Sequence, residues 1–296
     1  MPSKNNTIQQ HIFVQLLGIP FPAIILASLA FKNITRVTAI QSAASPIHHS
    51  LMALSVLGVF AGAIIIYSAD FLRDIPKAFQ IKSWWRMVAL FWLFLGATLL
   101  VFVFFHAYNL LYLNGIFIQV VPVKMMVIAI CVLLGIAMYY LLKATKYTKG
   151  QVILPFVIAL VISFSINLFP LMYSTNTLQY DILKMQLPIQ LLVFWLNLLI
   201  VAYFEMEKDE QHSINNIWTL YPKLMKQQLY FVVITLLVWV VWNTKVFPVD
   251  IGADVWLNLS VLFLLSYLLM ALKPNIFRWN SAYRFYVDLV LLLFLY

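Results

Sequence analysis

A series of long apolar runs, each of about 18 to 23 residues and separated by short polar stretches, constrains this chain more than any other feature. An α-helix needs about 20 apolar residues to cross the roughly 30 Å hydrocarbon core of a membrane. A transmembrane β-barrel has shorter runs in which apolar and polar residues alternate. Because only 10% of the residues are charged and 64% are hydrophobic, the chain lacks the polar side chains that cover a water-soluble globule. The sequence therefore predicts an all-α polytopic membrane protein.

The apolar runs predict about nine transmembrane helices, in one helical domain over residues 1–296 because no Gly/Ser-rich or Pro-rich linker divides the chain. The expected spans are 11–31, 49–69, 85–107, 122–142, 152–173, 186–205, 228–246, 254–272 and 281–296. In the last span, Arg284 and Asp288 have i, i+4 spacing and can pair on one helical face, which lowers the cost of charge near lipid. Gly58 and Gly62 form a GxxxG pattern in the second span, a spacing that permits close packing against another helix of the same chain.

The basic residues predict which loops face the cytoplasm, because cytoplasmic loops of membrane proteins carry an excess of Lys and Arg. The side of the membrane that holds the amino terminus receives 14 of the 19 basic residues. These are Lys4, Arg73, Lys77, Lys82, Arg86, Lys143, Lys146, Lys149, Lys208, Lys223, Lys226, Lys273, Arg278 and Arg284. The other side receives Lys32, Arg36, Lys124, Lys184 and Lys245. We expect a multi-pass protein of the inner (cytoplasmic) membrane with a cytoplasmic amino terminus and an external carboxyl terminus.

The net charge of +9 is thus a topology signal, and no soluble domain is expected that would bind nucleic acid. The single cysteine, Cys131, excludes a disulfide framework and a cysteine-based metal site. The five histidines show no metal-ligand spacing shared with the acidic residues.

Six of the ten acidic residues fall in two clusters, where the second and sixth expected spans reach the cytoplasmic side. Each cluster contains two acids at i, i+4 spacing: Asp70 with Asp74, and Glu205 with Asp209. On a helix this spacing places both carboxylates on one face, about 5–6 Å apart at Cβ. Such pairs can hold Mg²⁺, which commonly bridges a few carboxylates to the phosphate oxygens of a substrate.

The paired acids therefore indicate a phosphate or diphosphate ligand. Basic residues expected on the same side of the membrane can neutralise it: Arg73, Lys77, Lys82, Lys143 and Lys146. The alternative is that both clusters are solvated helix ends with local ion pairs, such as Asp70 with Arg73.

With these motifs the chain resembles the UbiA superfamily of intramembrane prenyltransferases, in length, in helix number and in acidic motifs after the second and sixth helices. In the first family motif, Asn-Asp-x-x-Asp-x-x-x-Asp, Asp70 and Asp74 match the last two acids, and Ile66 and Tyr67 replace Asn and Asp. The second family motif, Asp-x-x-x-Asp, is matched by Glu205 and Asp209, with a carboxylate retained at both positions. The Arg-Pro that follows the first motif in the family is absent from this chain.

The resemblance implies a ring of helices around a central cavity and the transfer of a polyprenyl group from its diphosphate to an acceptor, assisted by Mg²⁺. Asp70, Asp74, Glu205 and Asp209 would be the metal ligands and catalytic residues. The residues implied to bind substrate are Arg73, Lys77, Tyr139, Tyr140, Lys143 and Asn197. Aromatic residues beside the acids could stabilise an allylic cation or anchor helices at the membrane interface: Tyr67, Phe71, Tyr203 and Phe204.

Three alternatives remain open at the level of the sequence. The chain could be a non-catalytic homologue that still binds an isoprenoid diphosphate, a small-solute transporter, or a structural membrane partner. Transporters tend to place ionisable residues and helix breaks near the middle of the bilayer, whereas the acids here lie at its boundary. Asn167 and Asn197 fall within expected spans, where they could line a cavity or form hydrogen bonds between helices.

Overall fold

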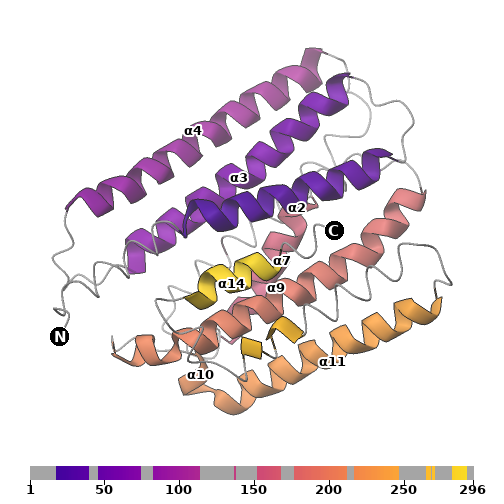
Figure 1. The fold of residues 1–296 in the computed structure, drawn as a ribbon. Helices are drawn as coiled ribbons and strands as arrows, with labels where there is room; N and C mark the ends of the chain where they lie inside the picture. The colour runs from indigo at the N-terminus through magenta and orange to yellow at the C-terminus, as the bar shows by residue number, and fades with distance from the viewer. Residues whose placement is uncertain are drawn as a thin grey trace. The chain divides into compact units, whose positions relative to one another are not determined.

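The structure is a computed structural model that describes residues 18–39, 46–74, 83–113, 137, 152–167, 177–211, 217–246, 265–267, 269–270 and 282–291. Every regular element among these residues is helical (Figure 1). The helices are α2 (Pro20–Ala39), α3 (Pro46–Asp74), α4 (Ser83–Leu113), α7 (Leu154–Ile166), α9 (Thr177–Gln211), α10 (Ile217–Leu220), α11 (Pro222–Val246) and α14 (Ala282–Leu291). The expectation of an all-α protein is confirmed for this part of the chain.

Three of the helices are long and apolar enough to cross a membrane. Their apolar segments are Met52–Ala69 in α3, Arg86–Asn109 in α4 and Leu187–Met206 in α9. These segments coincide with the expected spans 49–69, 85–107 and 186–205. Two shorter apolar helical segments, Pro20–Thr35 and Leu154–Ile166, fall within or overlap two further expected spans. Length and composition of these helices are those of a helical membrane protein.

The helices extend beyond their apolar segments, because hydropathy detects the apolar part of a helix and polar residues can continue it. The helix expected at 11–31 runs over Pro20–Ala39 in the described chain. Lys32 follows the expected span directly, but α2 continues past the end of that span, so Lys32 lies inside the helix. The expected spans 122–142 and 254–272 lie mostly outside the described residues.

Proline marks the first turn of several helices, where its missing N–H costs no hydrogen bond and its fixed φ suits the helix. Pro20, Pro46 and Pro222 are the first residues of α2, α3 and α11. Helix α3 ends at Asp74, directly before the dipeptide Ile75-Pro76, in which the proline disfavours helical backbone in the residue before it. Proline thus accounts for both boundaries of the helix that carries the first acidic pair.

The chain forms two compact units, and the first contains α2, α3, α4 and α14. Within it α3 packs against both α2 and α4. Helices α3 and α4 approach each other closely at Gly96 of α4, where an added Cβ would lie 2.9 Å from Ile65 Cγ1 and 3.1 Å from the Ala61 carbonyl oxygen. The GxxxG pattern of α3 is less crowded: a Cβ on Gly58 would lie 3.5 Å from Val103 Cγ1, and one on Gly62 would have no atom within 4 Å.

The second unit contains α7, α9, α10 and α11, and α9 packs against the other three. Within it the Trp195 ring of α9 packs edge-on against Phe156 of α7, with centroids 4.9 Å apart. The same indole lies against Phe231 of α11 at 6.1 Å. One tryptophan therefore joins three helices through aromatic contacts.

Many polar side chains inside these helices form hydrogen bonds within the protein, as an apolar surrounding favours. Several hydroxyl groups donate to the carbonyl four residues earlier in their own helix: Ser28, Thr98, Ser163, Ser165 and Thr235. The buried Asn167 amide donates to the Ser163 carbonyl of α7 and to Gln190 Oε1 of α9. The Tyr267 hydroxyl donates to Asn197 Oδ1 of α9 at 3.2 Å. Asn167 and Asn197 thus form hydrogen bonds between segments, which was one of the two roles expected for them.

Replacing Tyr267 by Phe removes only the hydroxyl that donates to Asn197, whose side chain is buried. We expect the free energy of unfolding to fall by about 0.6–1.7 kcal/mol, between the average and the largest value measured for hydrogen bonds between membrane helices in double-mutant cycles. Thermal unfolding of the purified protein in detergent measures the change. Tyr230→Phe in α11 is the matched control, since that tyrosine is 63% exposed. Equal stability of the two variants would contradict a stabilising role for the Tyr267 hydroxyl.

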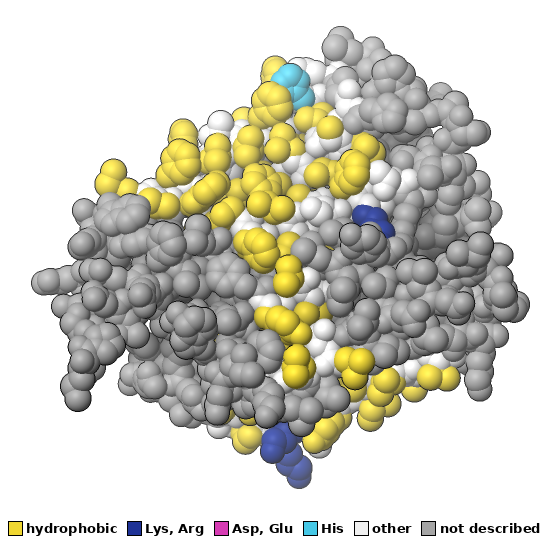
Figure 2. Space-filling model, viewed as in Figure 1, with side chains coloured by type: hydrophobic (Ala, Val, Ile, Leu, Met, Phe, Trp, Pro, Cys, Tyr) yellow, Lys and Arg dark blue, Asp and Glu magenta, His cyan; other side chains and the backbone are white. Residues whose placement is uncertain are grey.

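Apolar side chains cover much of the described surface (Figure 2). In the apolar segment of α4 only 11% of the residues are buried within the protein. Phe94 and Phe104, for example, are 73% and 76% exposed. A water-soluble protein rarely exposes an apolar helix to this extent, whereas lipid solvates such a surface at little cost.

Candidate functional site

The first acidic pair lies on uninterrupted helix. Helix α3 continues through Asp70 and ends at Asp74, and its apolar segment ends at Ala69. Asp70 and Asp74 are therefore separated by one helical turn, on one face, directly beyond the apolar segment. Their side chains, and that of Arg73, lie outside the described residues.

The end of α3 that leads to this pair is held by packing. Tyr67 and Leu72, on either side of Asp70 in the sequence, pack against the buried residues Ile19 and Ala89. Ile19 directly precedes α2 and Ala89 belongs to α4, so both neighbouring helices position the last turns of α3. Tyr67 therefore has a packing role in this structure, beside the roles that the sequence suggested for it.

The second acidic pair also lies on uninterrupted helix. Helix α9 runs to Gln211, past Glu205 and Asp209, and its apolar segment ends at Met206. Glu205 is half-buried. The prediction that each acidic pair is spaced by one helical turn at the end of an apolar segment is thus confirmed for the backbone of both motifs.

A short helix positions the end of α9 beside Glu205. The buried Trp218 of α10 donates from Nε1 to the Leu199 carbonyl oxygen at 3.0 Å. Its ring packs edge-on against Tyr203, with centroids 5.2 Å apart, and Tyr203 in turn lies edge-on to Phe204 at 5.8 Å. The aromatic residues before the acids are thereby fixed, with Phe204 buried and Tyr203 37% exposed.

Trp218 was not predicted from the sequence as part of this region. Its position in a short polar segment between two longer helices gives no sign that its indole contacts a carbonyl 19 residues earlier. Another polar partner between helices that sequence reasoning missed is Gln190, which accepts from Asn167.

The remaining predicted site residues divide into two groups. Asn197 is described, and its side chain accepts the Tyr267 hydroxyl. Lys77, Tyr139, Tyr140 and Lys143 lie outside the described residues, as does the side chain of Asp209.

Among the described side chains no group of three or more His, Cys, Asp or Glu residues is arranged to hold a metal ion. Three of the four predicted ligands have no described side chain, so Mg²⁺ binding stays a prediction. Helices α3 and α9 belong to different compact units, with one acidic pair in each.

What each motif offers chemically follows from its position. A carboxylate pair at the end of an apolar helix lies where a membrane meets water, so it can reach a metal ion or a charged headgroup while the rest of the helix contacts apolar chains.

Comparisons of the chain with protein-family models, with characterised proteins and with solved structures find no match.

Proposed function

We propose that this chain is a UbiA-like membrane protein that binds an isoprenoid diphosphate, with Mg²⁺ held by Asp70, Asp74, Glu205 and Asp209, and that it transfers the prenyl group to an acceptor. The observation that carries the proposal is the continuity of α3 and α9 through both acidic pairs, directly at the ends of two apolar segments of membrane length.

The position of the acids suits an amphiphilic ligand. An isoprenoid diphosphate has an apolar tail that lipid and apolar side chains can solvate, and a headgroup with several negative charges that needs cations. Carboxylates cannot bind such a headgroup directly, because like charges repel. They bind it through Mg²⁺, which coordinates carboxylate and phosphate oxygens together.

The distribution of ionisable residues favours this proposal over a small-solute transporter. Leaving tyrosine aside, the apolar segment of α3 contains no ionisable residue. That of α4 contains Arg86 at its start and His106 in its last turn, and that of α9 contains Glu205 near its end. Transporters commonly bind their substrates and coupling ions near the middle of the bilayer. In these three helices the ionisable residues lie at the ends.

The chemistry implied by the family resemblance is cleavage of the allylic C–O bond, with the bonding electron pair leaving on the diphosphate. The leaving diphosphate gains charge, and cations stabilise it in the transition state. On this proposal Arg73, Lys77 and Lys143 supply positive charge, and Tyr139 or Tyr140 contacts the substrate. A non-catalytic homologue would retain the binding step alone.

The proposal is tested by binding of geranylgeranyl diphosphate to the purified protein with Mg²⁺ and after its removal by EDTA. We expect affinity to fall at least roughly tenfold without the metal, as metal-bridged phosphate sites depend on their cation. Geranylgeraniol, which has the same tail and no diphosphate, is the matched control and should bind weakly in both conditions. Equal affinity with and without Mg²⁺ would contradict the proposal.

A further inference from the structure

Helix α11 has two opposite faces, one buried and one exposed. Its buried residues Met225, Val232 and Leu236 lie within about 40° of one another around the helix. Because α11 contacts α9 and α10, this is the face by which it packs in the second unit. The opposite face points away from those two helices.

The exposed face begins with polar residues. Lys223, Lys226 and Gln227 are exposed in the first two turns of α11, and Tyr230 follows with 63% of its surface exposed. The two lysines are three residues apart, which places their Cβ atoms about 5–6 Å from each other. Two ammonium groups on such neighbouring side chains can contact the oxygens of one phosphate. The Gln227 amide and the Tyr230 hydroxyl start from the same face and can also donate to it.

No carboxylate on the same helix competes for these lysines. Helices α10 and α11 contain no acidic residue, and the sequence has none between Glu210 and Asp250. The exposed face is therefore cationic at its start, which favours an anionic ligand. It also disfavours a second copy of the same face, because the like charges of the two copies would repel.

The same face continues as an apolar stripe. Ile234, Leu237 and Val241 are exposed, and they lie within the same 80° or so of the helix as the two lysines. From Tyr230 to Val241 the helix rises about 16–17 Å, close to half of the roughly 30 Å hydrocarbon core. The sequence predicts a membrane span over 228–246 that starts at the cytoplasmic side. A lipid headgroup at the lysines would thus have one leaflet of apolar helix beside its acyl chains.

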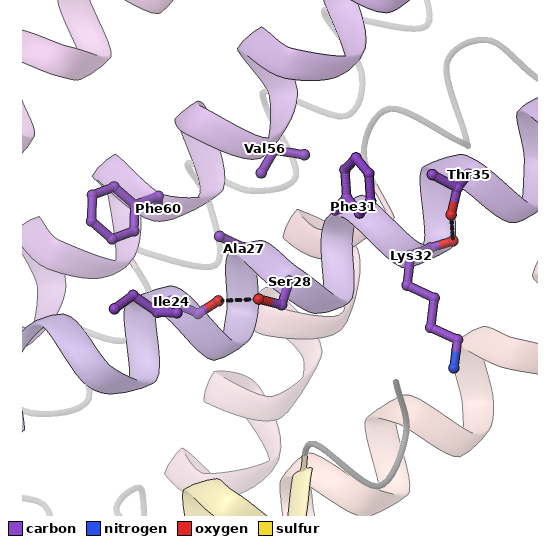
Figure 3. A pocket seen from close by; sticks show the side chains of 8 residues that line it. All are labelled: Ile24, Ala27, Ser28, Phe31, Lys32, Thr35, Val56 and Phe60. Carbon is purple, nitrogen blue, oxygen red and sulfur yellow. Dashed lines mark hydrogen bonds between the residues drawn. The ribbon is translucent and has the colours of Figure 1, made fainter. Parts of the chain in front are cut away.

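A groove in the first unit does not offer this combination. It lies between α2 and α3, and its lining includes the apolar residues Val56 and Phe60 (Figure 3). Lys32, the charged residue of this lining, points away from those two side chains (Figure 3). A headgroup on Lys32 would lie away from the apolar lining, whereas the two lysines of α11 share a face with the apolar stripe.

We propose that the exposed face of α11 binds an anionic phospholipid of the cytoplasmic leaflet, with its phosphate between Lys223 and Lys226 and an acyl chain along Ile234 and Val241. A zwitterionic headgroup carries a cation of its own beside the phosphate and gains less from two lysines, so the site prefers lipids with a net negative charge. The site is separate from the proposed diphosphate site, because none of the four acids lies on α11.

The test compares phosphatidylglycerol and phosphatidylcholine with identical acyl chains, bound to the purified protein in a neutral detergent and quantified by native mass spectrometry. We expect the wild type to bind phosphatidylglycerol more tightly. Lys223→Gln should weaken this binding roughly fivefold, the effect of one basic residue near an anionic membrane surface, and the double variant with Lys226→Gln should weaken it roughly 25-fold. Replacing both lysines by arginine should retain the affinity.

Two control variants locate the lipid. Lys245→Gln removes the same charge from the other end of α11 and should leave the affinity unchanged. Val56→Trp narrows the groove between α2 and α3 and should also leave it unchanged. Inorganic phosphate at the same concentration should not compete, since the acyl chains supply part of the affinity. Thermal unfolding of each variant verifies that it is folded.

Several results would overturn the inference. These are equal affinity for the two lipids, an equal loss in Lys223→Gln and Lys245→Gln, or a loss in Val56→Trp that matches the loss in the double variant. Competition by inorganic phosphate would assign the lysines to a free anion. A dimer that the double variant strengthens at unchanged lipid affinity would assign the face to a second copy of the chain. The double variant should retain Mg²⁺-dependent binding of geranylgeranyl diphosphate, so this inference and the proposed function can fail separately.

Discussion

Glu205→Gln is expected to weaken Mg²⁺-dependent binding of geranylgeranyl diphosphate by roughly tenfold or more, while Glu207→Gln leaves it within about twofold. Changes to the outer-shell partners of metal ligands alone typically cost 10–100-fold in affinity, and loss of a ligand oxygen should cost at least as much. Both variants remove one negative charge from the same turn of α9. They therefore have the same effect on net charge, but they remove a carboxylate from different faces of the helix.

The helical geometry of α9 places the two glutamates on nearly opposite faces of the helix. At about 100° per residue, Glu205 and Asp209 lie some 40° apart around the helix, whereas Glu207 lies about 200° from Glu205. Binding is measured by equilibrium titration, and thermal unfolding in parallel separates a loss of ligand from a loss of fold. Equal weakening by Glu205→Gln and Glu207→Gln would show that the end of α9 acts through its overall charge and not through a carboxylate pair.

Gly96→Ala is expected to lower the free energy of unfolding by about 1–3 kcal/mol, the usual cost of overpacking a close contact. The new methyl group would lie 2.9 Å from Ile65 Cγ1 and 3.1 Å from the Ala61 carbonyl oxygen. A side chain can shift, but the carbonyl oxygen belongs to the backbone of α3, so the two helices must move apart. Asp70 lies nine residues beyond Ala61 on α3, and a displaced α3 would also change the position of the first acidic pair.

Gly62→Ala is the matched control, because it makes the same substitution in a helix of the same unit. An added Cβ there has no atom within 4 Å. Alanine is favoured over glycine in a helix by up to about 1 kcal/mol, so this variant should be as stable as the wild type or more stable. Thermal unfolding in detergent compares them. A Gly96→Ala protein as stable as Gly62→Ala would mean that α3 and α4 can separate at little cost.

The apolar runs predicted the helices that carry the acids, because a membrane imposes both composition and length on a helix. They predicted the ends less well. Helix α9 begins at Thr177, nine residues before its expected start, and includes Pro188 within it. Polar residues such as Gln179 and Asp181 can be part of a helix, but they do not raise the local hydropathy from which the spans were predicted. The same limitation ended the first expected span at residue 31, although α2 continues through Lys32 to Ala39.

For the candidate site, the sequence predicted spacing but not partners. The i, i+4 relation of Asp70 with Asp74, and of Glu205 with Asp209, follows from helix geometry once the helix is known to continue. The contact of Trp218 with the Leu199 carbonyl depends on how a short helix folds back on a long one. No periodicity in the sequence encodes that contact, because it arises from tertiary packing. The close approach at Gly96 is of the same kind, and the GxxxG pattern on α3 did not reveal it.

The most direct test of the proposed site is a double-mutant cycle with Asp70→Asn and Glu205→Gln, read as Mg²⁺-dependent affinity for geranylgeranyl diphosphate. If both pairs act on one metal-bound diphosphate, each single variant weakens binding, and the double variant departs from the sum of the two free-energy changes by roughly 0.5–3 kcal/mol. Stability should change little in any of the three. Unchanged affinity in all three variants, or two losses that simply add, would contradict a shared site and leave the acidic pairs as solvated helix ends.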